Sequence, residues 1–339
     1  MNTNRLTWID WMKCIGMYFI IFGHFFSIGY RYVYVFSVPL FFFISGFLCK
    51  YESNQITFWK KLWSNLVVPT IIIYVINALI IPLIFSRYQH IDLSNIASIR
   101  RIILYPIIGM QNALDTCWFI YTLIVIKILH QYVCKLRWRI ILIISSLFLS
   151  YIYNHIDMSI IHPLLQNPNA IANAFTAYPF FVVGNSLYQY KDWLNNYHNK
   201  KMIVTCYFIC IIIVYLCGNY NNDVWMYMGG YGDNMLLFLL GGIAGSIAIF
   251  CIAKIIPYTP HAVITVSIGT IIILGFHKHF ISITQYFFYV PPIIDFFSAL
   301  IILFLFIPII KILEIWFPII LGKHRINNNN KQISSNKTI

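Results

Sequence analysis

Residues 9–29 read IDWMKCIGMYFIIFGHFFSIG, an apolar run long enough to cross a bilayer that nevertheless carries three ionisable side chains. A spanning helix needs about 20 mostly apolar residues, and this run meets that requirement. Asp10, Lys13 and His24 are the ionisable residues, and such groups are costly to place among lipid tails. The stretch therefore predicts a first membrane helix whose charged residues are candidates for function.

The composition of the whole chain extends this interpretation to a polytopic membrane protein. Apolar residues make up 60% of the 339 positions and charged residues 10%, against about 45–50% and 25% in soluble domains. The net charge of +13 comes from short Lys and Arg clusters between apolar runs, which is typical of membrane loops and not of a nucleic-acid surface. No nucleic-acid partner is expected. The eight Cys residues lack the spacing of a metal site or a disulfide framework, so no metal is expected.

The apolar runs predict an all-α bundle of about ten spanning helices. Each candidate is long enough to cross a membrane, within an uncertainty of a few residues at its ends. The predicted spans are 9–29, 33–49, 66–86, 113–134, 138–154, 172–190, 201–218, 234–254, 262–282 and 293–317. The stretch 100–112 is too short to span and is expected to be interfacial or re-entrant.

The positive charges predict the orientation of this bundle. With ten helices and a cytoplasmic N-terminus, all but five of the 23 Lys and Arg residues fall on the cytoplasmic side, as the positive-inside rule requires. Both termini are thus expected in the cytoplasm, with the chain in the inner (cytoplasmic) membrane of the cell. Residues 1–322 form a single membrane-embedded domain in this interpretation, and residues 323–339 a disordered cytoplasmic tail.

The spacing of the three ionisable residues places them near one face of the first helix. Lys13 and His24 are eleven residues apart, which corresponds to a separation of about 20° around the helix and about 16.5 Å along it. Asp10 lies about 40° from the same line. His24 is either a general base, because imidazole titrates near neutrality, or a neutral packing residue that hydrogen-bonds a neighbouring helix.

Four motifs resemble those of the acyltransferase-3 family of membrane acyltransferases. The first is Arg5-x4-Asp10-x2-Lys13 with an apolar run to Gly23-His24, and the second is the aromatic block of residues 38–48 that ends in Ser-Gly-Phe-Leu. Cys117-Trp118-Phe119 is similar to the family's Trp-Phe motif, and residues 267–277 to its late Gly-to-His segment. The shorter sugar O-acetylases, including the fucose 4-O-acetylase-like branch, are the most similar members.

This resemblance implies transfer of an acyl group, usually acetyl from acetyl-CoA, to a hydroxyl of a surface glycan or a lipid-linked carbohydrate. His24 then takes the catalytic position together with Asp10, and Lys13 helps to hold the anionic donor. Acetyl-CoA is a substrate in this scheme, and no permanently bound cofactor is expected. Many members carry two arginines after the second helix, where this chain has Lys60 and Lys61. These lysines either bind donor phosphates as point charges or only anchor the topology.

The remaining candidates are assigned to substrate binding. They are Trp118, His277, Arg101 and Ser45. Trp118 could instead belong to the aromatic belt of the membrane, and Arg101 could simply mark the interface. Asp115 is expected to pair with an arginine.

Two other classes of protein share these features. A polysaccharide or lipid transporter would also have many helices and buried charges, although no internal repeat of the kind found in many transporters is visible. A non-catalytic membrane scaffold is the second alternative. The sequence does not identify the acceptor sugar, the acyl length or the oligomeric state.

Overall fold

The computed structural model describes residues 5–81, 99–133, 136–156, 169–222, 224–287 and 292–322. Regular structure in this part of the chain is helical, apart from one isolated β-bridge between Met110 and Asn169. The predicted all-α class is confirmed. The predicted tail, residues 323–339, lies outside the described residues, and the single-domain assignment stays a prediction.

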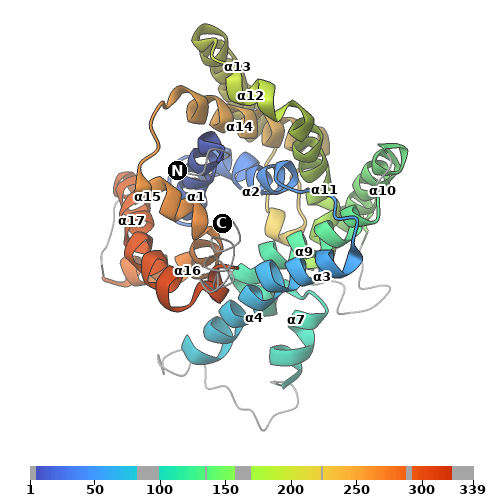
Figure 1. The fold of residues 1–339 in the computed structure, drawn as a ribbon, viewed down its shortest axis with the longest axis vertical. Helices are drawn as coiled ribbons and strands as arrows, with labels where there is room; N and C mark the ends of the chain where they lie inside the picture. Colours follow the sequence, from blue (N-terminus) through green and yellow to red (C-terminus); the bar gives the residue numbers. More distant parts are fainter. Residues whose placement is uncertain are drawn as a thin grey trace, which may run out of the picture.

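Two helices occupy the middle of the bundle (Figure 1): α1, Thr7–Gly23, and α2, Tyr30–Phe47. They pack against each other, and further helices surround the pair. The helices that contact α1 are α14 (Met235–Ile255), α15 (His261–Ile268), α16 (Thr270–Phe287) and α17 (Pro292–Trp316). Those that contact α2 are α11 (Ala170–Leu187), α13 (Lys200–Tyr220) and α14.

The remaining helices lie around these elements (Figure 1). The chain from Gln55 to Ile80 is one helical run, composed of α3 (Gln55–Leu62), the π-helical turn η1 (Trp63–Val67), α4 (Val68–Val75) and a second π-helical turn η2 (Ile76–Ile80). Shorter or peripheral helices are α7 (Tyr105–Ile107), α8 (Gln111–Leu114), α9 (Trp118–Gln131), α10 (Leu136–His155) and α12 (Lys191–Asn196). Single π-helical turns are rare and frequently lie at functional sites.

Each predicted span overlaps a helix, but the number ten stays a prediction. In the described part of the chain, six helices are long and apolar enough to cross a membrane, and a bent pair makes a seventh. The overlapping helices α1, α10 and α11 are not among them, and α1 has only 17 residues. The cytoplasmic location of the termini also stays a prediction.

The bent pair differs from the single span predicted over 262–282. Helices α15 and α16 meet at an angle of 87°, with Gly269 between them. A side chain there would force Ile310 of α17 to move, because a Cβ at Gly269 would lie 2.2 Å from its Cδ1.

Helices α2 and α11 approach each other backbone to backbone. A Cβ built on Gly46 would lie within 2 Å of the carbonyl oxygen of Phe181, and one on Gly184 would lie 2.0 Å from that of Phe43. Lipid-embedded helices associate largely through van der Waals contact, and glycine permits the closest approach. Asn185 adds hydrogen bonds from its amide nitrogen to the carbonyl oxygens of Gly46 and Cys49, at 3.1 and 3.0 Å.

Replacing Gly46 with alanine should separate these two helices. We expect Gly46→Ala to lower the free energy of unfolding by about 3 kcal/mol, because the atom in the way is backbone and cannot rotate aside. Thermal unfolding in a mild detergent measures this change. Gly23→Ala is the control, since its Cβ would meet Val33 at an ordinary 3.5 Å; equal melting temperatures for the two variants would contradict the prediction.

Candidate active site

A cavity of about 660 Å³ lies at the end of the bundle where α1 ends and α2 begins. Its wall comes from five parts of the chain that are distant in sequence. They are the end of α1 with the turn after it, α2, residues 101–119, residues 225–227 and α16. The volume is in the range of pockets that bind small molecules.

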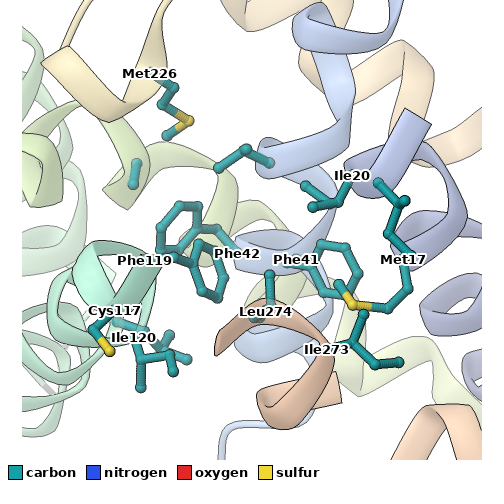
Figure 2. Close-up of a cluster of buried hydrophobic side chains, with 14 of the residues drawn as sticks. Met17, Ile20, Phe41, Phe42, Cys117, Phe119, Ile120, Met226, Ile273 and Leu274 are labelled. Atoms are coloured by element: carbon teal, nitrogen blue, oxygen red, sulfur yellow. The ribbon is translucent and has the colours of Figure 1, made fainter. Parts of the chain in front are cut away.

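Part of the cavity wall is apolar and rigid. Ile20, Phe41, Phe119, Met226 and Leu274 line it and belong to the main buried core. Figure 2 shows Phe119 of α9 beside Phe41 and Phe42 of α2, with ring centroids 4.5 Å apart for Phe42 and Phe119. Such packing fixes the shape of the cavity.

Two histidines contact each other on the cavity wall. His24 follows the last residue of α1, and His277 lies in α16; the two ring centroids are 4.7 Å apart. His277 is 3% exposed, whereas His24 is only partly buried and faces the cavity. Two imidazoles in contact at a cavity provide groups that can accept and donate protons.

Hydrogen bonds define which ring nitrogen of His277 carries the hydrogen. Its Nδ1 lies 2.9 Å from the carbonyl oxygen of Ile273 and 3.0 Å from that of Leu274. Carbonyl oxygens only accept, so Nδ1 carries the hydrogen and Nε2 presents a lone pair. That Nε2 atom is buried and has no hydrogen-bond partner within the described protein.

The His24 ring contacts a tyrosine. Its Nδ1 lies 3.2 Å from the hydroxyl of Tyr34, one turn inside α2. The contact has two tautomeric forms. With the hydrogen on Nδ1, the tyrosine oxygen accepts and Nε2 is left as a base; with the hydrogen on Nε2, the tyrosine donates.

The turn that carries His24 has an unusual backbone. The predicted span 9–29 continues as a helix only to Gly23, and residues 24–29 turn the chain into α2. Phe26 has a φ of 53° and Gly29 a φ of 87°. A left-handed conformation is uncommon for a bulky residue and is found where surrounding structure holds it, often at functional sites.

Asp115 is the second non-glycine residue of the described chain with positive φ, at 44°. It also lines the cavity, and its carboxylate accepts a hydrogen bond of 2.7 Å from the Lys278 ammonium. The partner is therefore a lysine of α16 and not the arginine that we expected. Both side chains are about half exposed, so this pair contributes little to stability.

A polar network holds the part of α16 that carries His277. The Asn77 side chain, in η2, donates to the carbonyl oxygen of Gly275 at 2.9 Å and lies 3.1 Å from Nε2 of His279. The Thr116 hydroxyl donates to the same Gly275 oxygen at 2.9 Å. A π-helical turn thus directs an amide toward the segment beside the histidine pair.

The structure brings four of the sequence candidates together. His24, Arg101, Trp118 and His277 all line the cavity, although 253 residues separate the two histidines in sequence. Arg101 and Trp118 thus lie where they could contact a ligand.

The other candidates lie away from the cavity lining. Asp10 is buried and accepts two hydrogen bonds from the Arg5 guanidinium, at 2.7 and 2.8 Å. Lys61 pairs with Glu52, and Lys60 is exposed. Lys13 lies three turns before His24 on α1, and Ser45 lies in the last turn of α2.

Sequence reasoning missed several cavity residues. They are Phe26, Tyr34, Gln111, Asn112, Trp225 and Tyr227. Aromatic and amide residues are common in apolar chains, so no motif distinguishes them. The positive φ of Phe26 and the unpaired amide of Gln111 are visible only in three dimensions.

Comparison with known proteins identifies the class. Residues 6–312 match the model of an acyltransferase domain that defines the acyltransferase-3 family. The helices and this match together define a multi-pass membrane acyltransferase. The chain belongs to the acyltransferase-3 family, as its motifs predicted; the narrower sugar O-acetylase branch stays a prediction. No curated protein and no solved structure matches the chain.

The Asn77 network gives a test of how the histidine segment is held. We expect Asn77→Leu to lower the free energy of unfolding by about 1–2 kcal/mol, because the Gly275 carbonyl and His279 lose a partner. Acyl transfer should also fall, although Asn77 does not line the cavity. Thermal unfolding and an activity assay measure the two effects. Asn195→Leu, at an exposed position of α12, should change neither; a similar loss in both variants would contradict the assignment.

Proposed function

We propose that this chain transfers an acetyl group from acetyl-CoA to a hydroxyl of a cell-surface or lipid-linked carbohydrate. The observation that carries the proposal is the contact between His24 and His277 on the wall of a cavity in a chain of an acyltransferase family. Proton transfer by a positioned imidazole is a common means of activating a hydroxyl.

In this proposal His24 is the general base. Its Nδ1 hydrogen is donated to the Tyr34 oxygen, and its Nε2 takes the proton of the acceptor hydroxyl. The hydroxyl oxygen attacks the thioester carbonyl carbon, the carbon–sulfur bond breaks, and the CoA thiolate leaves and recovers the proton from the imidazolium. The Nε2 lone pair of His277 accepts a hydrogen bond from the acceptor and so helps to orient it.

In this proposal the acetyl-CoA donor binds at the half of α1 that is far from His24. Lys13 lies about 16.5 Å from His24 along the helix, toward the end of the bundle that also carries Lys60 and Lys61. An ammonium group attracts the phosphates of CoA, while the flexible arm of CoA carries the thioester inward. Arg5 holds Asp10 in a two-bond ion pair at the same end of α1 as Lys13, and the catalytic role of Asp10 stays a prediction.

The acceptor is assigned to the cavity. Trp118 and Arg101 line it beside the histidines, and they would contact a sugar or the anionic group of a lipid-linked precursor. The proposed location is the inner membrane of the cell. Membership of an acyltransferase family supports this chemistry over the transporter alternative, which requires no histidine pair.

The His24 assignment is tested by loss of the imidazole. Removal of a general base typically lowers a rate by about 10²–10⁴-fold, so His24→Ala should abolish detectable acyl transfer. Mass spectrometry of surface glycans compares cells with the wild-type chain, a deletion, and His24→Ala at matched expression. The same acyl mass should disappear from the same sugar in both altered strains.

His198→Ala provides the matched control, because His198 is exposed and lies between α12 and α13. Its glycans should keep the acyl group. Loss of the acyl mass in the deletion alone would show that His24 is structural. Glycans that keep their acyl groups but change in length or amount would favour a transporter.

A further inference from the structure

Gln111 is a buried residue whose side chain has no partner in the protein. It is 4% exposed, lines the cavity, and neither its amide nitrogen nor its amide oxygen makes a hydrogen bond within the described residues. Five buried side-chain polar atoms of the described chain lack a partner, and three of them belong to Gln111 and His277 on this one wall. Buried polar groups are normally paired, so this concentration indicates groups reserved for a ligand.

The chemistry of an amide restricts that ligand. The nitrogen donates and the oxygen accepts, side by side in one plane. An alkyl chain satisfies neither atom, and a phosphate group offers only acceptors and leaves the oxygen unpaired. A hydroxyl both donates and accepts, so two adjacent hydroxyls can satisfy the amide together. The lone pair on His277 Nε2 also needs a donor, which a further hydroxyl supplies.

A cluster of aromatic rings forms another part of the same wall. The centroids of Phe26, Tyr34 and Trp225 lie 5.6–6.1 Å apart, with tilted planes. Phe26 is 55% exposed and held in its left-handed conformation. Aromatic rings supply a large apolar surface of defined shape, against which the C–H face of a saturated ring can pack.

The pyranose sugars are a ligand class with both properties. A pyranose carries adjacent hydroxyls around its edge and C–H bonds on its faces. Pockets of this size combine apolar walls with a few polar groups that fix orientation. Tyr34 links the aromatic cluster to the histidines, because its ring belongs to the cluster and its hydroxyl contacts His24.

We infer that Gln111 and the cluster of Phe26, Tyr34 and Trp225 form a subsite for one pyranose ring of the acceptor. The Gln111 amide holds two adjacent hydroxyls, the rings hold a C–H face, and a third hydroxyl is presented to the histidines. This last statement rests on the proposed function; binding of the sugar does not. Gln111 thereby selects for the arrangement of hydroxyls around the ring.

The structure offers a matched control for Gln111. Gln131 is also 4% exposed, but its amide nitrogen donates to the carbonyl oxygen of Glu52 at 2.6 Å and its oxygen accepts from the Glu52 amide at 3.4 Å. Replacing a satisfied buried amide with leucine leaves its partners unpaired, whereas replacing an unpaired one removes a cost. Gln131→Leu should therefore lower the melting temperature, and Gln111→Leu should leave it unchanged or raise it.

Sugar binding is measured by saturation-transfer-difference NMR on the full chain in lauryldimethylamine oxide. The probes are the methyl β-glycosides of glucose, galactose and N-acetylglucosamine at millimolar concentration. At least one should receive saturation on its C–H protons from the wild-type protein. The signal should fall at least about tenfold in Gln111→Leu, as expected for loss of hydrogen bonds made only with the ligand. It should also fall in Trp225→Leu, and persist in Gln131→Leu and in Trp193→Leu, whose indole is exposed on α12.

Three results would overturn the subsite: no binding of any of the three glycosides to the wild-type chain, unchanged binding in Gln111→Leu, or a melting temperature that falls as far in Gln111→Leu as in Gln131→Leu.

Transfer from radiolabelled acetyl-CoA to the same glycosides separates this inference from the proposed function. Binding that depends on Gln111 without any transfer would support the subsite and contradict the acetyl-CoA reaction. Transfer with an unchanged KM for the glycoside in Gln111→Leu would support the acetyl-CoA reaction and contradict the subsite.

Discussion

The contact between the backbones of α2 and α11 is the constraint on which the rest of the structure depends. In lipid there is no hydrophobic force between helices, so close van der Waals packing has to hold them. Gly46 and Gly184 allow two helices to meet without side chains between them, and Asn185 adds hydrogen bonds across the contact. Since α2 is fixed in this way, the turn before it is fixed as well, and that turn carries His24.

Around this turn, the cavity wall combines apolar side chains with polar imidazoles. Its core side is packed with aromatic and aliphatic side chains, which hold the shape of the cavity. Its reactive side has two imidazoles in contact, one of them with its tautomer set by backbone carbonyls. Hydrogen bonds from Asn77 and Thr116 to Gly275 of α16 tie the segment of the second histidine to parts of the chain that are 198 and 159 residues away in sequence. A group that transfers protons acts efficiently only when it is held in place, and these contacts hold both imidazoles at the cavity wall.

Much of the fold could be predicted from hydropathy, and much of the site could not. Apolar runs located helices at every predicted range, because length and composition largely decide what can cross a bilayer. Length and hydropathy do not predict local turn geometry. The early end of α1 at Gly23 and the bend at Gly269 therefore differ from the predicted spans. The motif residues His24 and His277 were recognisable, since an imidazole is rare and costly in an apolar segment.

Partners across the fold were not recognisable from the sequence. Asp115 was expected to meet an arginine and instead meets Lys278, because nothing in the sequence specifies which helix lies beside residues 100–117. Gln111 resembles any loop glutamine until its burial and its missing partners are known. A linear sequence shows which groups are present and leaves open which of them lack a partner.

The turn between α1 and α2 has a consequence for inhibition. His24 caps the end of α1, where its backbone N–H bonds the carbonyl oxygens of Ile20 and Ile21, and it begins a loop of six residues with two left-handed positions. A displacement of this loop would pull on the residue that carries the imidazole. A small molecule that binds against the outer face of this loop would shift His24 relative to the other cavity residues without entering the cavity, so its effect would not require competition with a ligand there.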